Sequence, residues 1–95
     1  MEQITFTKLA LEVSGDELDF NHARSQADLL VAQHLREPLL IAWYDGIKQE
    51  EHPKVPECQH KPGWIAYAEG HGGEVLIDVN QGQFMFIYAD LENMR

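Results

Sequence analysis

The side chains that could carry chemistry gather in residues 45–63, which contain the only cysteine, Cys58, and two of the five histidines, His52 and His60. His60 stands two positions after Cys58. In an extended chain, residues two apart point the same way, so both side chains could face one metal ion. Thiolate and imidazole are the ligands that zinc prefers. One interpretation of this stretch is therefore a zinc site made of Cys58, His52 and His60.

The spacing of these donors is not specific for a metal. A single Cys-x-His with one more histidine upstream arises often by chance, whereas paired Cys-x-x-Cys motifs would be a strong signal. The simpler interpretation is that both histidines hydrogen-bond to backbone or water and that Cys58 packs as a small apolar side chain. We therefore expect no cofactor, with zinc as the alternative.

Cys58 could also be a nucleophile. A helix expected to begin at about Gly63 would place its positive end, together with Lys61, near the thiol and would favour the thiolate. Neighbouring Glu57 opposes this effect, and no motif of a known nucleophile family is present. Nearby histidines could serve as the base. A metal-dependent or thiol-based enzyme centred on Cys58 is thus the alternative function.

A long polar connection followed by an aromatic helix is typical of a binding surface. Residues 45–63 have no periodicity of their own, and a connection of that length is unusual within a compact domain unless it has a function. We predict a small ligand- or partner-binding module with its site at this loop and the following helix. The residues expected to bind the ligand are Cys58, His60, Lys61, Trp64 and Tyr67.

The elements that must position these residues follow from hydrophobic periodicity. The pattern predicts strands at 3–13, 39–45, 74–79 and 83–90, with helices at 21–36 and 64–73. A strand is the alternative for the last of these helices, but the glycines that follow it favour the helix. In the last two strands, Val75, Ile77 and Val79 are expected to face Phe84, Phe86 and Tyr88. The helix between the first two strands permits their parallel pairing.

This order, β-α-β-loop-α-β-β, predicts one α+β domain spanning residues 1–95. We expect two layers, with a four-stranded mixed sheet and two helices mainly on one face. A small sheet of this kind leaves edges that can pair, so the first or last strand could support a homodimer.

The bulk composition limits the partners. The chain has 95 residues, 44% hydrophobic and 24% charged, with a formal charge of −9. Such acidity opposes binding to nucleic acid and to anionic membranes, because affinity for phosphate comes from Lys and Arg. No secretory signal or membrane-spanning run is visible, so we expect a cytoplasmic location. A small molecule or a protein remains as the possible partner.

The second half of the chain also carries a recognisable set of residues. The set comprises Asp45, Pro53, Val55, Cys58, the run Lys61 to Trp64, Tyr67-Ala68, Gly72-Gly73 and the DVN and FIY parts of the hairpin. It resembles a family of small uncharacterised proteins from anaerobic bacteria and archaea, a domain of unknown function. The resemblance implies a small α+β domain and assigns no activity.

Overall fold

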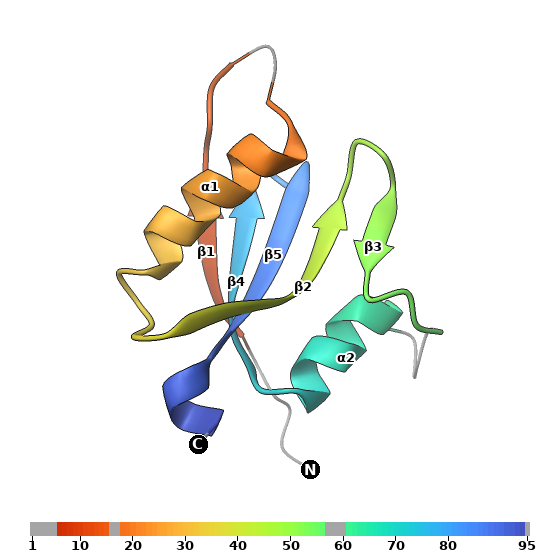
Figure 1. Ribbon diagram of the computed structural model, residues 1–95. Helices are drawn as coiled ribbons and strands as arrows, with labels where there is room; N and C mark the ends of the chain where they lie inside the picture. Colours follow the sequence, from red (N-terminus) through yellow and green to blue (C-terminus); the bar gives the residue numbers. More distant parts are fainter. Residues whose placement is uncertain (1–5, 16–17, 57–60, 95) are drawn as a thin grey trace.

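The computed structural model describes residues 6–15, 18–56 and 61–94 and has an α+β fold, with two α-helices and one mixed sheet (Figure 1). The elements in chain order are β1 (Thr7–Leu11), α1 (Phe20–Val31), β2 (Pro38–Asp45), β3 (Glu50–His52), α2 (Gly63–Gly70), β4 (Gly73–Val79), β5 (Phe84–Asp90) and a short 3₁₀ helix, η1 (Leu91–Met94). Neither α-helix in the described ranges is long and apolar enough to cross a membrane.

The sheet has five strands in the order β1-β4-β5-β2-β3, rather than the four that were predicted. The additional strand, β3, has only three residues, all polar, and therefore lacks an apolar alternation that could reveal it. β1 runs parallel to β4, and the other neighbours are antiparallel. The predicted parallel pairing of the first two strands is wrong, because β4 and β5 lie between them. These two strands are buried on both faces and so take the centre.

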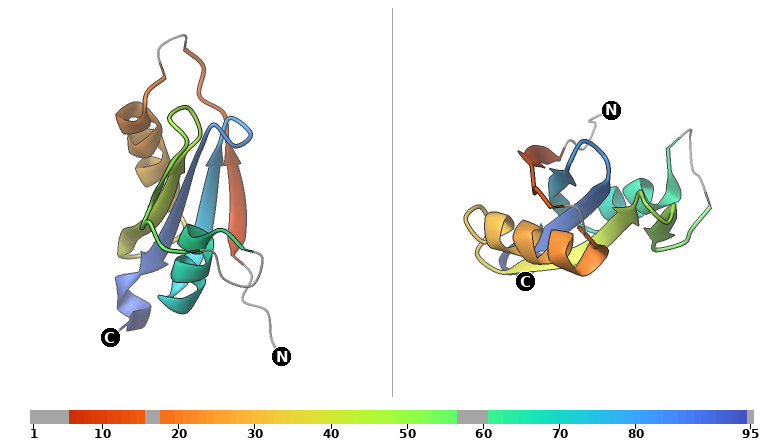
Figure 2. Two further views of the ribbon diagram at one scale, coloured as in Figure 1. Left: turned by 90° about the vertical axis from the view of Figure 1, so that its right-hand side faces the viewer. Right: turned by 90° about the horizontal axis from the view of Figure 1, so that it is seen from above.

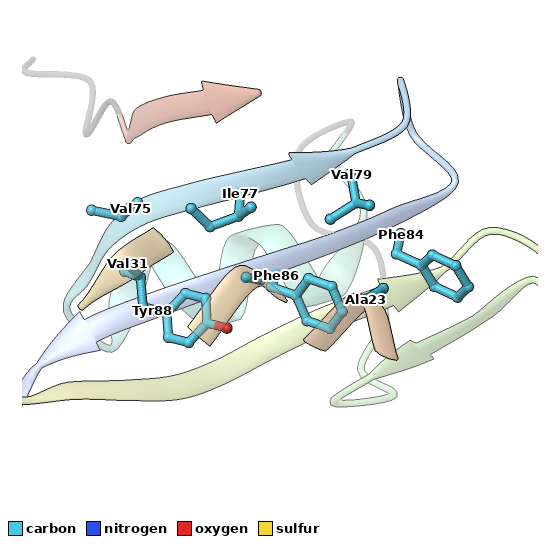
Figure 3. Close-up of a cluster of buried hydrophobic side chains, with 9 residues drawn as sticks. Ala23, Val31, Val75, Ile77, Val79, Phe84, Phe86 and Tyr88 are labelled. Carbon is cyan, nitrogen blue, oxygen red and sulfur yellow. The ribbon is translucent and has the colours of Figure 1, made fainter. Parts of the chain in front are cut away.

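The predicted hairpin of β4 and β5 is confirmed, with its predicted cross-strand partners. Ile77 lies opposite Phe86, Val79 opposite Phe84 and Val75 opposite Tyr88. These six side chains form one hydrophobic core with Ala23, Ala27 and Val31 of α1 (Figure 3). Each of the nine is at most 4% exposed, so this face of the sheet supplies much of the apolar burial that stabilises the fold.

A second core lies on the opposite face of the sheet, beneath α2. Side chains alternate along a strand, so Leu76 and Ile87 point away from α1 and pack against Trp64 and Ala68 of α2. The predicted placement of both helices on one face is therefore wrong: the sheet is the middle of three layers (Figure 2). The sequence of α2 is apolar around most of its circumference, and hence has no single stripe that would indicate which face it covers.

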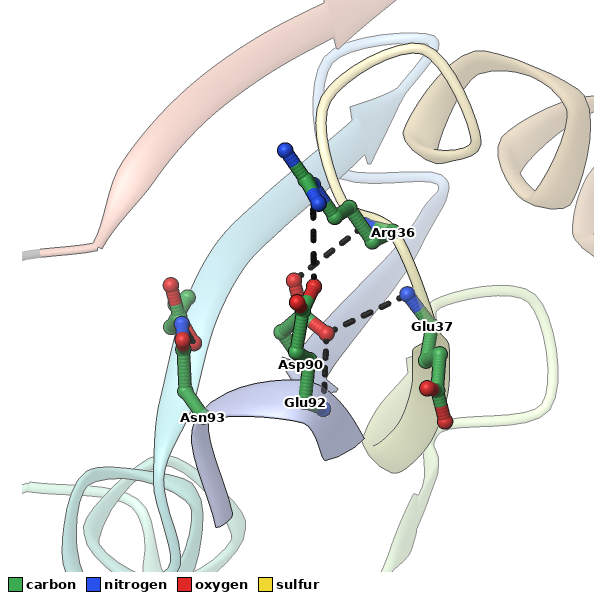
Figure 4. Close-up of polar contacts among 6 residues, drawn as sticks. Arg36, Glu37, Asp90, Glu92 and Asn93 are labelled. Atoms are coloured by element: carbon green, nitrogen blue, oxygen red, sulfur yellow. Dashed lines mark hydrogen bonds and ion pairs between the residues drawn. The ribbon is translucent and has the colours of Figure 1, made fainter. Parts of the chain in front are cut away.

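Helix α1 ends at Val31, before the predicted end at Arg36. After Val31 the backbone bonds change from the α type to i→i−3, from the N–H of Gln33 to Leu30 and from that of His34 to Val31. Further along, the carboxylate of Asp90 accepts hydrogen bonds from the backbone N–H groups of Arg36 at 3.2 Å and Glu37 at 3.1 Å (Figure 4). It also accepts one from Glu92 at 3.0 Å. Backbone donors satisfied by this side chain do not need helical carbonyl partners, so the chain turns away from the helix axis and enters β2.

Candidate ligand pocket

The stretch from residue 45 begins as part of the sheet. Asp45 is 7% exposed, and its Oδ1 accepts hydrogen bonds from the backbone N–H groups of Ile47 and Lys48, both at 3.0 Å. The turn held in this way leads into β3, which pairs antiparallel with the end of β2. The first part of the predicted long loop is thus an ordered hairpin.

The far end of the same stretch is held against α2. Gly63 has no side chain, and a Cβ at this position would fall against the carbonyl oxygens of Val55 and Pro56. The ammonium Nζ of Lys61 donates to both carboxylate oxygens of Glu69, at 2.9 and 3.0 Å. The described parts of the stretch are therefore anchored to the body of the molecule at both ends.

Two of the three predicted metal ligands, Cys58 and His60, lie outside the described residues. The third, His52, is exposed and stacks on the indole of Trp43, with ring centroids 4.1 Å apart. Within the described ranges, no group of three or more His, Cys, Asp or Glu side chains could hold a metal ion. The zinc set of Cys58, His52 and His60 stays a prediction.

The predicted ligand-binding aromatics have partners within the fold. Trp64 is 4% exposed and stacks on Tyr44, with centroids 5.8 Å apart. Tyr67 is half-buried and stacks on His71 at 3.9 Å. Neither residue lines the pocket described next, and neither does Lys61. Their part in ligand binding, like that of Cys58 and His60, stays a prediction.

A pocket of about 480 Å³ lies between α2 and strands β1, β4 and β5; we call it the α2 pocket. Its lining residues are Phe6, Lys8, Leu9, Ala10, Ile65, Glu69, Leu76, Asp78 and Met85. Phe6 and Leu76 belong to the core beneath α2, and Ile65 and Met85 pack against that core. The pocket therefore has an apolar floor, and its volume falls in the range typical of small-molecule sites.

Three charged side chains line the α2 pocket, and two of them already have partners. Glu69 is paired with Lys61, and Asp78 accepts a hydrogen bond through its Oδ1 from the N–H of Gly82 at 2.6 Å. Lys8 is exposed and makes no ion pair with any residue in the described ranges. The pocket therefore offers one available ammonium group beside an apolar surface.

A second, smaller hollow of about 300 Å³ lies between the start of α1 and the β2–β3 turn. Its apolar walls include Phe20, Ile47 and Phe84. It shares no lining residue with the α2 pocket and therefore provides an internal comparison for binding experiments.

The α2 pocket was missed in the sequence because distant segments build it. Period-2 spacing does place Phe6, Lys8 and Ala10 on one face of the first strand, which was the available signal. That spacing does not reveal that Leu76 and Ile65 lie beside the same face, because this depends on the β1–β4 pairing and on the side that α2 covers.

A family model for a domain of unknown function, DUF5619, matches residues 6–88 of this chain. The chain belongs to the DUF5619 family. The match begins just before β1 and ends within β5. The family resemblance noted above for the second half therefore extends to the first half, which contributes β1 and α1 to the DUF5619 fold.

A solved structure shares the DUF5619 fold. The crystal structure of AF1514, described as a novel non-family-model protein from the archaeon Archeoglobus fulgidus DSM 4304, matches with a TM-score of 0.75. Sequence identity is 23%, and the match covers 90% of this chain and 95% of that one. At this identity the likeness shows the fold alone. No curated protein matches the chain.

Proposed function

We propose that this DUF5619 protein is a small-molecule-binding module and that the α2 pocket is its site. The observation that carries the proposal is the construction of the pocket: about 480 Å³, with an apolar floor and a few charged side chains. Sites for small molecules typically combine apolar walls with a small number of polar groups that orient the ligand. One residue of the stretch that the sequence singled out, Lys61, is hydrogen-bonded to Glu69, which lines the pocket.

The lining favours a ligand with an apolar body and an anionic end. Burying ~100 Å² of apolar ligand surface against the floor would contribute about 2.5 kcal/mol. An anionic end would pair with Lys8, because Glu69 and Asp78 are acidic and already have donors. The net charge of −9 repels anions, but at physiological ionic strength salt largely screens charges that are more than about 8 Å away. The ligand class is therefore a small aliphatic or aromatic carboxylic acid.

Titration of isotope-labelled protein with octanoate, followed by NMR, tests this proposal. We expect saturable shifts of the methyl signals of Ile65, Leu76 and Met85, which line the pocket. Octylamine, with the same chain and the opposite charge, should bind several-fold more weakly. Lys8→Gln removes the one available ammonium, so it should weaken octanoate binding, and it should strengthen octylamine binding because it removes a like charge.

Two tryptophan variants locate the site. Ile65→Trp fills the α2 pocket and should abolish octanoate binding, whereas Ile47→Trp places the same bulk at the second hollow and should preserve it. If Ile65→Trp does not fold, Met85→Trp fills the pocket from β5 instead. Binding that survives both pocket variants would refute the proposal. If Tyr67→Ala loses binding and Ile65→Trp keeps it, the ligand binds on the face of α2 that carries Tyr67 and not in the α2 pocket.

A further inference from the structure

Strand β1 has an unpaired edge. It pairs with β4 on one side, and no strand of the described chain pairs with the other (Figures 1 and 2). The carbonyl of Leu11 accepts a hydrogen bond from the N–H of Asn80, next to β4, at 2.9 Å. Backbone groups of alternate residues point to opposite sides of a strand, so the N–H and C=O groups of Lys8 and Ala10 point outward. An edge of this kind is a template for pairing with another chain.

The usable edge continues beyond the end of β1. The side-chain amide of Asn80 donates to the carbonyl of Val13 at 3.0 Å, and its oxygen accepts from the N–H of Val13 at 2.8 Å. This pair of bonds replaces a strand partner and holds the chain beside the sheet as far as Val13. Glu12 is exposed between these fixed points, and by the same alternation its backbone groups also point outward.

The opposite edge of the sheet is poorly suited to pairing. β3 contains three residues, and two of them, Glu50 and Glu51, are acidic. Two copies meeting along this edge would bring like charges together, which is one way in which proteins protect sheet edges. The β1 edge, by contrast, has one cation at Lys8 and, one residue beyond the strand, one anion at Glu12; on that face the small side chain of Ala10 lies between them.

We propose that β1 pairs antiparallel with β1 of a second copy, around a two-fold axis beside Ala10. In this register each Lys8 lies opposite Glu12 of the other copy, and each Leu9 lies opposite Leu11. The charged pairs fall on the face that carries α2, and the leucine pairs fall on the face that carries α1. The outward backbone groups complete about six hydrogen bonds, and the two sheets become continuous.

Neighbouring registers lack this complementarity. A two-fold axis beside Lys8 would place the two Lys8 ammonium groups opposite each other, and like charges directly across a pair are destabilising. An axis beside Leu9 would place Lys8 opposite Ala10 and Glu12 opposite Phe6, so neither charge would gain a partner. The register centred on Ala10 satisfies both charges and pairs leucine with leucine. The inference rests on the edge and its register rather than on a ligand, but Lys8 also lines the α2 pocket, so the dimer is tested without ligand.

Light scattering and sedimentation of the full chain across a concentration series test the proposal. At an ionic strength of ~0.15 M, where general repulsion between the copies is almost fully screened, we expect a dimer, and we expect Glu12→Lys to raise its dissociation constant at least about tenfold. This variant changes the formal charge from −9 to −7, because one negative charge becomes positive, so general repulsion between copies falls. A weaker dimer despite lower repulsion would therefore report the loss of the specific pair. The double variant Lys8→Glu with Glu12→Lys restores opposite charges and should recover the wild-type constant.

Two further variants control for folding and net charge. Glu50→Lys on β3 makes the same change in net charge away from β1, and it should leave the dimer intact or strengthen it. Ala10→Pro removes an outward N–H without removing a bond to β4, and it should give a folded monomer, because proline is tolerated on sheet edges. Monomeric wild-type protein at about 1 mM would overturn the proposal. So would a Glu12→Lys dimer as tight as the wild type, or a double variant that fails to recover.

Discussion

At the scale of single residues, Asp90 shows how one carboxylate determines the path of the chain. It is 5% exposed and joins the end of β5 to the connection between α1 and β2 and to η1. Burial alone would raise the pKa of its carboxyl. Hydrogen bonds from the backbone N–H groups of Glu92, Arg36 and Glu37, aided by the charge of Arg36, outweigh burial and hold the pKa of Asp90 below its ordinary value.

This pKa shift predicts an acid-dependent loss of stability. A carboxyl whose pKa is lower in the folded state stabilises the fold above its unfolded pKa, about 3.9, and this stabilisation disappears as the pH falls through the folded pKa. Asp90→Asn should therefore lower the urea midpoint at pH 7, and the difference from wild type should shrink below a pH of about 4. Urea unfolding of both proteins, followed by Trp fluorescence from pH 2 to 8, measures this difference in midpoint. A difference that is constant over this range would contradict the role of the charge.

At the scale of elements, the parts that the sequence predicts are those encoded by local alternation. The strands around Asn80, Gln81 and Gly82 alternate cleanly, and these three turn residues have the positive φ angles, 52°, 57° and 93°, that such a turn requires. The facing of Ile77 and Phe86 follows from that pattern and is confirmed. Local pattern and local turn chemistry agree here, so the hairpin was predictable.

Two long-range features, the partner of each strand in the sheet and the face that each helix covers, were not predictable in the same way. Nothing in the residues of β1 distinguishes β2 from β4 as its partner, because both offer apolar strands at a permitted distance along the chain. Likewise, Trp64 and Ala68 could have covered either face of the sheet. Because the α2 pocket depends on both choices, its lining was not visible in the sequence, although Lys8 and Phe6 were visible as members of one face.

The close approach of Val55 and Pro56 to the start of α2 leads to a prediction for Gly63. In Gly63→Ala, the new methyl group would collide with backbone carbonyls of Val55 and Pro56, which cannot rotate away as a flexible side chain would. Overpacking of this kind costs ~1–3 kcal/mol. Gly70→Ala is the matched control in the same helix, since nothing lies within 4 Å of its Cβ, and it should change stability by less than about 1 kcal/mol. Equal urea midpoints for the two variants would show that the stretch does not press on α2.

At the scale of the whole molecule, net charge opposes the proposed dimer while local charge favours it. For two copies of the protein, each of charge −9 and ~30 Å apart in water, the Coulomb repulsion energy without salt would be about 11 kcal/mol. About a third of that remains at an ionic strength of ~0.01 M, and only a few hundredths at ~0.15 M. Each exposed pair of Lys8 with Glu12 contributes at most about 1 kcal/mol. Repulsion therefore decides the sign of the salt effect.

The proposed dimer should consequently tighten as salt is added. Raising the ionic strength from ~0.01 M to ~0.15 M removes several kcal/mol of repulsion and should lower the dissociation constant at least about tenfold, even though the Lys8–Glu12 pairs weaken. Sedimentation equilibrium at the two ionic strengths measures the change. Glu50→Lys should show a smaller salt effect, because repulsion scales with the product of the two net charges and this product falls when −9 becomes −7. A dimer that weakens with salt would mean that local pairs dominate the association, contrary to this estimate.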